Sequence, residues 1–350
     1  MNKHTRTIAA FVAVLAGVAV ITSVAAADRS ERRHVSGTIW VANRGANTIR
    51  GFDAATGSVV NTVAMAPSSQ PGDLASARGK LYVSEEFGSS PAIAIVDAGS
   101  GEVLKRILTG PRPHHVHVSR DGKLIAYGVF GTNKVGIIDT RTDTLVGEWP
   151  ASLNPAARSH AGVFSPDGDT VYVANDVVNE LAAVDPLTGA LLWTMTVPSA
   201  HELAVTRDGK TAYVSCRAGN ALRIVDLERH EVIATIPLGP TPDTLQLSKN
   251  ERQLTVGLRG SPAQVAVVNT RTLESAIVTI GGVGTIAGHQ WTSPNGRLTF
   301  AAFEGPGAGV AMIDHRHGNT VLQILDYPGR PHGVAFVRAN DSETDEDSDD

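Results

Sequence analysis

The sequence predicts an all-β protein: a seven-bladed β-propeller of four-stranded antiparallel blades, closed by a C-terminal strand that completes the first blade. Three observations carry this prediction. A β-rich unit recurs at intervals of 41 to 46 residues. Each copy holds four short strands separated by turn signals, and a spare strand follows the last copy. A period near 43 residues with four strands in each unit is typical of propeller blades.

The clearest copy of the unit spans residues 159–197 and contains the strand-like runs GVFS, VYVAN, LAAVD and LLWTMTV. The segment 165–168, SPDG, predicts a turn. Proline presets one φ angle, aspartate accepts hydrogen bonds from the backbone that follows it, and glycine adopts a positive φ. The segment 185–189, DPLTG, predicts a second turn. The β-branched and aromatic residues at 171–173 suit a pleated, half-buried strand, and the unit has no sustained helical period.

Copies of the second strand set the register of the repeat, at residues 39–41, 81–83, 125–127, 171–173, 212–214, 254–256 and 298–300. The turn after the third strand recurs in step, beginning at Asp53, Asp97, Asp139, Asp185, Asp226, Asn269 and Asp314. The first copy begins at its second strand, 38–43, and the spare strand at 333–337 would complete it. Closure matters because each blade buries its faces only against its neighbours. We expect the propeller to span residues 38–338.

The first 27 residues predict a secretory signal peptide. Lys3 and Arg6 precede an apolar run at 8–20, and three alanines at 25–27 offer a cleavage site. A membrane anchor is the alternative, but the run is short for a spanning helix. We therefore expect an exported, monomeric protein, periplasmic or extracellular, with a linker at 28–37 and no membrane span after cleavage.

Charge and cysteine content exclude several classes of function. Residues 339–350 are expected to form a disordered acidic tail, since seven of them are Asp or Glu. Without the signal peptide and this tail the formal charge of the body is zero, which argues against a nucleic-acid partner, because that would require a basic face. Cys216 is the only cysteine, so there is no internal disulfide, and no C-x-x-C-H motif for covalent haem is present.

The residues VYVAN at 171–175, after SPDG and before VDPLTG, resemble the YVTN-repeat propellers, the family of the YncE-like exported proteins. The resemblance covers nearly the whole chain after the signal peptide. It implies the propeller fold. It implies no single activity, because such propellers include binding proteins, surface-layer proteins and relatives of enzyme domains.

Histidine recurs at the start of the innermost strand of most units. These positions hold His114, His160, His201, His289 and His332, with Asp243 in another unit and Asp73 one residue later in the remaining one. Innermost strands surround the central channel, so we expect these side chains to converge at one mouth, with His115 beside them. Imidazole and carboxylate groups are the usual ligands of copper, zinc and iron. The pattern therefore predicts a transition-metal site.

Charged residues are expected to form a rim around this mouth. The loops after the second strands contribute Arg44, Glu85, Glu86, Asp176, Cys216, Arg217, Arg259 and Glu304. Arg112 and Arg330 come just before histidine positions, and Glu202 follows His201. A mixed-charge rim of this kind would orient a polar or anionic ligand.

The sequence is compatible with three functions. In the first, the mouth binds a small molecule or a protein partner with a transition metal. In the second, the protein is a metal-dependent enzyme, a lyase, hydrolase or copper oxidoreductase, with His201 and Glu202 or His114 and His115 supplying the general base. In the third, it is an interaction scaffold whose histidines only pin the blades, as Gly-His pairs do in WD-type propellers. The sequence has no nucleophile elbow and no phosphate-binding loop.

Overall fold

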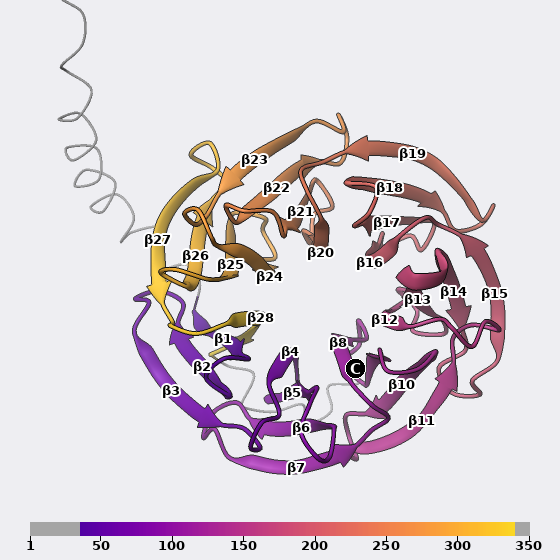
Figure 1. The fold of residues 1–350 in the computed structure, drawn as a ribbon, viewed down its shortest axis with the longest axis horizontal. Helices are drawn as coiled ribbons and strands as arrows, with labels where there is room; N and C mark the ends of the chain where they lie inside the picture. The colour runs from indigo at the N-terminus through magenta and orange to yellow at the C-terminus, as the bar shows by residue number, and fades with distance from the viewer. Residues whose placement is uncertain (1–35, 340–350) are drawn as a thin grey trace, which may run out of the picture.

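The computed structural model describes residues 36–339, which form seven four-stranded antiparallel sheets arranged around a central axis (Figure 1). The predicted seven-bladed propeller is confirmed. The predicted signal peptide, most of the predicted linker and nearly all of the predicted acidic tail lie outside the described residues. Within the described range, no helix combines the length and the apolar character needed to cross a membrane.

The innermost strand of each blade borders the channel (Figure 1). From blade 1 to blade 7 these strands are β28 (Pro331–Arg338), β4 (Pro71–Ala77), β8 (Pro113–Val118), β12 (Ser159–Phe164), β16 (Ala200–Val205), β20 (Pro242–Leu247) and β24 (Ile286–Thr292). The second strands are β1 (Gly37–Asn43), β5 (Lys80–Glu85), β9 (Leu124–Val129), β13 (Val171–Asn175), β17 (Thr211–Cys216), β21 (Gln253–Leu258) and β25 (Leu298–Glu304).

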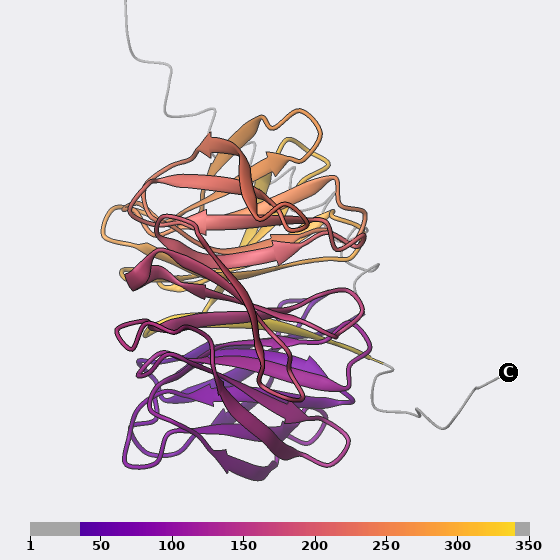
Figure 2. The same cartoon turned by 90° about the vertical axis from the view of Figure 1, so that its right-hand side faces the viewer.

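The third strands are β2 (Thr48–Asp53), β6 (Ala92–Asp97), β10 (Lys134–Asp139), β14 (Glu180–Val184), β18 (Ala221–Asp226), β22 (Gln264–Asn269) and β26 (Gly309–Asp314). The outermost strands are β3 (Val59–Ala64), β7 (Val103–Leu108), β11 (Thr144–Pro150), β15 (Leu191–Thr196), β19 (Glu231–Pro237), β23 (Ser275–Thr279) and β27 (Thr320–Asp326). One short 3₁₀ helix, Asp176–Val178, follows β13. Seen from the side, the blades make a squat disc (Figure 2).

The ring closes through the spare C-terminal strand, as predicted. β28 pairs antiparallel with β1, and Ile39 lies opposite Phe336. The first blade is therefore built from both ends of the described chain, so no strand edge is left open where the ring begins.

The recurring aspartates organise the turns between third and fourth strands. Oδ1 of Asp53 accepts the backbone N–H groups of Ala55 and Thr56, at 3.1 and 2.7 Å. Asp185 holds the backbone of Leu187 and Thr188 in the same way. This self-capping is the property that favours aspartate at a turn. This capping explains why aspartate recurs at the start of the turns between third and fourth strands.

Apolar side chains fill the space between adjacent blades. Each of the seven buried clusters combines residues of two neighbouring blades, with one cluster at every blade interface. Trp40 of blade 1, for example, is 1% exposed and packs with Leu81 and Val83 of blade 2. The protein is therefore stabilised by contacts between blades, as expected for a repeat fold.

Candidate metal centre

Every innermost strand carries a β-bulge at the predicted site positions. The pairing with the second strand skips His115 in β8, His160 in β12 and His201 in β16. In the other four blades it skips two residues, which include Asp73, Asp243, His289 and His332. A bulge leaves its extra residue out of the regular ladder and redirects the side chain. These residues can therefore face the channel while their neighbours pack between blades.

The histidine side chains form a cluster, and His115 lies at its centre. Its ring centroid lies 4.6 Å from that of His114, 4.3 Å from His160 and 4.5 Å from His289. His201 is 5.8 Å away and His117 is 6.5 Å away. His115 has a φ of 20° and is 1% exposed. Uncommon backbone conformations of this kind are concentrated at functional sites.

Three of the rings form a compact triangle. His114, His115 and His160 have centroids 4.3 to 4.6 Å apart in all three pairings. One ligand nitrogen from each lies within 4.8 Å of the other two. Two further groups of this kind share His115: one with His117 and Glu202, the other with His201 and Asp243. His201 also packs against His160, with ring centroids 3.5 Å apart.

Buried carboxylates hold most of these histidines. Nδ1 of His114 lies 2.7 Å from Glu86, and Nδ1 of His115 is hydrogen-bonded to Glu202. The remaining pairs are His117 Nε2 with Glu202 at 3.2 Å, His201 Nε2 with Asp243 at 2.6 Å, His289 Nδ1 with Asp73 at 2.9 Å and His332 Nδ1 with Glu304 at 3.5 Å. Carboxylates that fix one ring nitrogen are typical partners of metal-bound histidines, because they orient the other nitrogen.

His160 takes part in none of these pairs. Its Nδ1 is buried and has no hydrogen-bond partner among the described residues. An unpaired buried nitrogen is costly, on the order of 1–3 kcal/mol. A bound ion or another ligand would remove that cost.

Electrostatics favour neutral imidazoles beside ionised carboxylates. Burial lowers the pKa of His114 to about 4, although Glu86 acts in the opposite direction. Burial and the neighbouring His201 and His115 rings hold the pKa of His160 well below its usual range. Burial alone would raise the pKa of Glu86, but His114 and Arg44 hold it at about 2. A neutral imidazole has the free lone pair that metal coordination requires.

Three further carboxylates and two further histidines follow the same division, and His117 is an exception. Burial opposes ionisation of Asp73, Glu202 and Asp243, yet neighbouring histidines, and Arg217 beside Asp243, keep the three pKa values low. Burial lowers the pKa of His289 and that of His332. The pKa of His117 is raised, because the Glu202 carboxylate outweighs the effect of burial.

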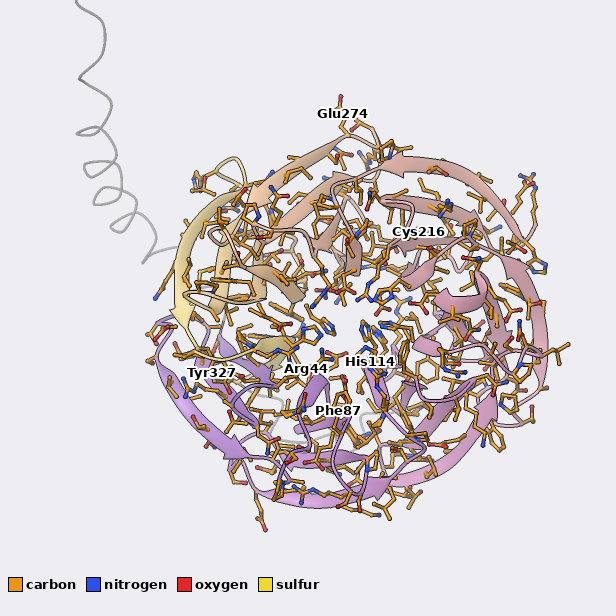
Figure 3. All side chains as sticks on the ribbon, viewed as in Figure 1. Arg44, Phe87, His114, Cys216, Glu274 and Tyr327 are labelled. Carbon is orange, nitrogen blue, oxygen red and sulfur yellow. The ribbon has the colours of Figure 1, made fainter. Side chains whose placement is uncertain are left out.

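Arginines cover the histidines on the side where the innermost strands begin. Arg44 pairs with Glu86 at 2.5 Å, Arg217 with Asp243 at 2.7 Å, and Arg330 with Glu304 at 2.8 Å. Arg259 bridges Asp243 and Glu304, each at 3.3 Å. The predicted rim is therefore a network of ion pairs in which each of these guanidiniums already has a carboxylate partner. Arg44 and His114 lie at the centre of the ring (Figure 3).

Other residues named from the sequence lie apart from this network. Arg112 stacks on Phe87 and Phe130, 5.2 and 4.7 Å from their ring centroids. Glu85 pairs with Arg106 at 2.8 Å. Cys216 is buried in the apolar cluster between blades 4 and 5, away from the channel (Figure 3).

His115 was expected only beside the predicted ligands, and His117 was not among them. In the structure His115 occupies the bulge position that His160 and His201 hold in their strands, and it belongs to all three candidate ligand groups. The sequence signal for this was the run His114-His115-Val116-His117, whose alignment with the other units is ambiguous by one residue.

Comparisons with known proteins agree with this architecture. A family model described as a YncE-like β-propeller matches residues 81–252. The chain is 22% identical over 238 residues to the YncE protein of Salmonella typhi, covering 63% of this chain and 66% of the relative, just under two thirds of its length. The same identity and coverage hold for the YncE protein of Salmonella typhimurium.

Two solved structures illustrate the likeness of fold. A functionally unknown protein from Desulfotomaculum acetoxidans superposes with a TM-score of 0.71 at 13% identity, covering 87% of this chain and 99% of that chain. Dihydro-heme d1 dehydrogenase NirN, in complex with DHE, superposes with a TM-score of 0.62 at 16% identity, covering 85% and 74%. At these identities the likeness shows the fold alone. Over residues 81–252, and in the closed ring of seven four-stranded blades, the chain is similar to the YncE-like β-propellers.

Proposed function

We propose that this propeller binds a first-row transition metal ion on its axis, with His114, His115 and His160 as the ligands. The observation that carries the proposal is the triangle of buried rings whose centroids lie 4.3 to 4.6 Å apart. Three imidazoles and an open fourth position suit zinc, copper, nickel or iron, the metals for which imidazole is a common ligand.

The surroundings of the triangle support the proposal. Glu86 and Glu202 hold Nδ1 of His114 and of His115, which leaves Nε2 of each ring to coordinate. The buried Nδ1 of His160 has no other partner among the described residues. Each ligand comes from a strand that the ring of blades fixes in place, so the site is preorganised by the fold.

We further propose that the protein works outside the cytoplasm. The support is the sequence of residues 1–27, with its basic start, apolar run and terminal alanines. N-terminal sequencing of protein from the exported fraction tests this directly. The expected mature terminus is Asp28, whereas an intact Met1 in a cell-associated protein contradicts export.

Metal binding is tested by calorimetry on tag-free protein that has been stripped with a chelator. We expect one equivalent of Zn²⁺, Cu²⁺, Co²⁺ or Ni²⁺ per chain, and loss of this binding in His115→Ala and in His160→Ala. His317→Ala is the matched control, because His317 lies in a turn and its side chain is 66% exposed. Circular dichroism checks that the variants remain folded.

The scaffold alternative predicts a different outcome. If the histidines only pin the blades, the variants lose stability and the native protein takes up no metal. Full metal uptake by both folded histidine variants would also overturn the assignment of the ligands.

A further inference from the structure

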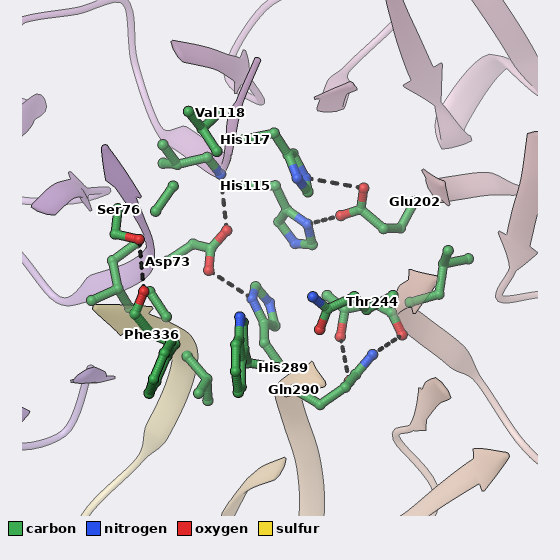
Figure 4. A pocket seen from close by; sticks show the side chains of 18 residues that line it. Asp73, Ser76, His115, His117, Val118, Glu202, Thr244, His289, Gln290 and Phe336 are labelled. Atoms are coloured by element: carbon green, nitrogen blue, oxygen red, sulfur yellow. Dashed lines mark hydrogen bonds and ion pairs between the residues drawn. The ribbon is translucent and has the colours of Figure 1, made fainter. Parts of the chain in front are cut away.

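The channel has a second feature beside the metal site. A cavity of about 260 Å³ lies among the innermost strands, and its walls include Asp73, Ser76, His115, His117, Val118 and Glu202 (Figure 4). His115 is the one member of the metal triangle that lines it. His115 therefore lies between the cavity and the other two residues of the triangle, His114 and His160.

The direction of the strands shows at which end the cavity lies. Its lining residues are 73–76 of β4, 115–118 of β8, 244–246 of β20, 289–291 of β24 and 334–336 of β28, together with Glu202. The arginine network lies where these strands begin. The lining residues come after that point in each strand, so the cavity lies further along the strands than the arginines. Val118, at the end of β8, lines the cavity and is 37% exposed, so it marks the opening. The cavity opens away from the mouth that the sequence predicted.

The polar end of the cavity is suited to a cation. Asp73 and Glu202 contribute two carboxylates, and among the described lining residues there is no lysine or arginine. Asp73 accepts from Val116 N–H and from His289, while Glu202 accepts from His115 and Leu203 N–H and also pairs with His117 Nε2 at 3.2 Å. A carboxylate has about four acceptor positions, so both retain capacity for a ligand.

His289 adds a third acceptor at this end. Its Nδ1 donates to the Asp73 carboxylate, which fixes the tautomer and leaves Nε2 as an acceptor. That Nε2 is buried and has no hydrogen-bond partner among the described residues, and His289 as a whole is 5% exposed. A primary ammonium has three N–H donors, the same number as these acceptor groups.

The remaining wall combines the polar residues Ser76, Thr244, Gln246 and Gln290 with an apolar, partly aromatic part. Leu74, Val116, Leu245 and Val334 line it with Trp291 and Phe336, whose rings stack with centroids 4.5 Å apart at an angle of 25°. The volume is below the roughly 300–1,000 Å³ of pockets for drug-sized ligands. Such a space takes about one ring or a short aliphatic chain.

We propose that this cavity binds a small organic amine: a primary ammonium group held by Asp73, Glu202 and His289, attached to one apolar or aromatic group that packs toward Trp291 and Phe336. This site is additional to the metal centre and does not require a bound ion. The ligand enters from the face at which Val118 is exposed.

The test uses benzylamine as the probe, titrated calorimetrically into metal-free protein near pH 7. Benzyl alcohol and benzoate have the same ring with a neutral and an anionic head group. We expect benzylamine to bind at least about tenfold more tightly than either. No detectable binding of benzylamine at millimolar concentration, or equal binding of benzoate, would overturn the proposal.

A pair of variants at the opening locates the binding. Val118→Trp places a large side chain at the entrance and is expected to weaken benzylamine binding at least about tenfold, while Val118→Ala changes it by less than about threefold. Thermal unfolding establishes that both variants are folded. Unchanged affinity in a folded Val118→Trp variant would show that the probe binds elsewhere and would overturn the proposal.

The outcome is separable from that of the metal proposal. Both variants leave the metal triangle intact and should take up metal like the native protein. Benzylamine binding without metal uptake would overturn the metal centre alone, and metal uptake without benzylamine binding would overturn the cavity alone.

Discussion

Asp73 Oδ1 lies 2.9 Å from Nδ1 of His289, although the two residues are 216 positions apart in the chain. The other oxygen of Asp73 accepts the backbone N–H of Val116, also at 2.9 Å. One buried carboxylate thus joins blades 2, 3 and 7. The histidine cluster is part of what holds the ring together, so ligand binding at the axis and the stability of the fold are coupled.

Replacing Glu86 with glutamine should weaken metal binding without abolishing it. The amide oxygen of glutamine can still accept from His114 Nδ1, but the charge that increases the basicity of the ring is lost. Losses of this kind are about 10- to 100-fold in affinity. Competition with a chromophoric chelator measures the change. Glu228→Gln is the control, since Glu228 is 64% exposed and pairs with Lys210, and an equal loss in both variants would contradict the role assigned to Glu86.

The metal-free protein should lose stability as the pH falls below about 6.5. In the unfolded chain histidines take up protons near that pH, whereas the folded His160 and His332 resist protonation because burial lowers their pKa values. The unfolded state then binds more protons, so the free energy of unfolding decreases toward acid. His114, with its pKa lowered to about 4, accounts for a loss of roughly 3 kcal/mol in the free energy of unfolding between pH 6.5 and about 4. His117 opposes the trend, since its pKa is raised, but it is one group against several.

Urea unfolding at several pH values between 7.5 and 4.5 measures this dependence. The depressed pKa of Glu86 extends the loss below pH 4.5, toward about 2. A free energy of unfolding that stays constant or rises between pH 6.5 and 4.5 would contradict the neutral, buried state assigned to these histidines.

Gly128→Ala should disturb the metal centre from a neighbouring strand. A Cβ at position 128 would meet the backbone carbonyl oxygens of Ser159 and His160, so β12 would have to move. Overpacking of this kind costs about 1–3 kcal/mol, and the shift of His160 should weaken metal affinity as well. Gly282→Ala is the control, because a Cβ there meets no atom within 4 Å. Chemical denaturation and metal titration of both variants test the prediction, which fails if they behave alike.

Removing β28 should prevent the ring from closing. A chain truncated after residue 330 lacks the strand that pairs with β1, and it would expose that edge and the apolar residues Trp40 and Ile39. Exposed edges of this kind promote aggregation. Size-exclusion chromatography and thermal unfolding should show aggregated or unfolded protein. Truncation after residue 339 retains all of β28 and should leave the melting temperature unchanged. A monomeric, cooperatively folded 330-residue chain would contradict closure by β28.

The fold could be predicted because its signals are local and repeated. Asp53, Asp185 and their counterparts begin turns that need only the following few residues, so the sequence displays the period directly. Closure was also predictable, because residues 333–337 resemble a strand that has no unit of its own. The convergence of histidines followed from the same register.

The details of the site could not be predicted in this way. A bulge shifts the register by one residue, and nothing local in His114-His115-Val116-His117 indicates which histidine is left unpaired in the ladder. The cavity is defined by residues such as Trp291 and Phe336, from strands that meet only when the ring closes. In the sequence, their positions within apolar strands are those expected of core residues that pack between blades.

The location of a bound metal tests the central claim most directly. A crystal of the protein grown with Zn²⁺ or Cu²⁺, with diffraction recorded at the absorption edge of that metal, gives its position from anomalous scattering. We predict one strong peak on the propeller axis, about 2.0–2.1 Å from a nitrogen of each of His114, His115 and His160. Peaks only at peripheral histidines such as His230 or His317, or no peak at all, would contradict a metal centre on the axis.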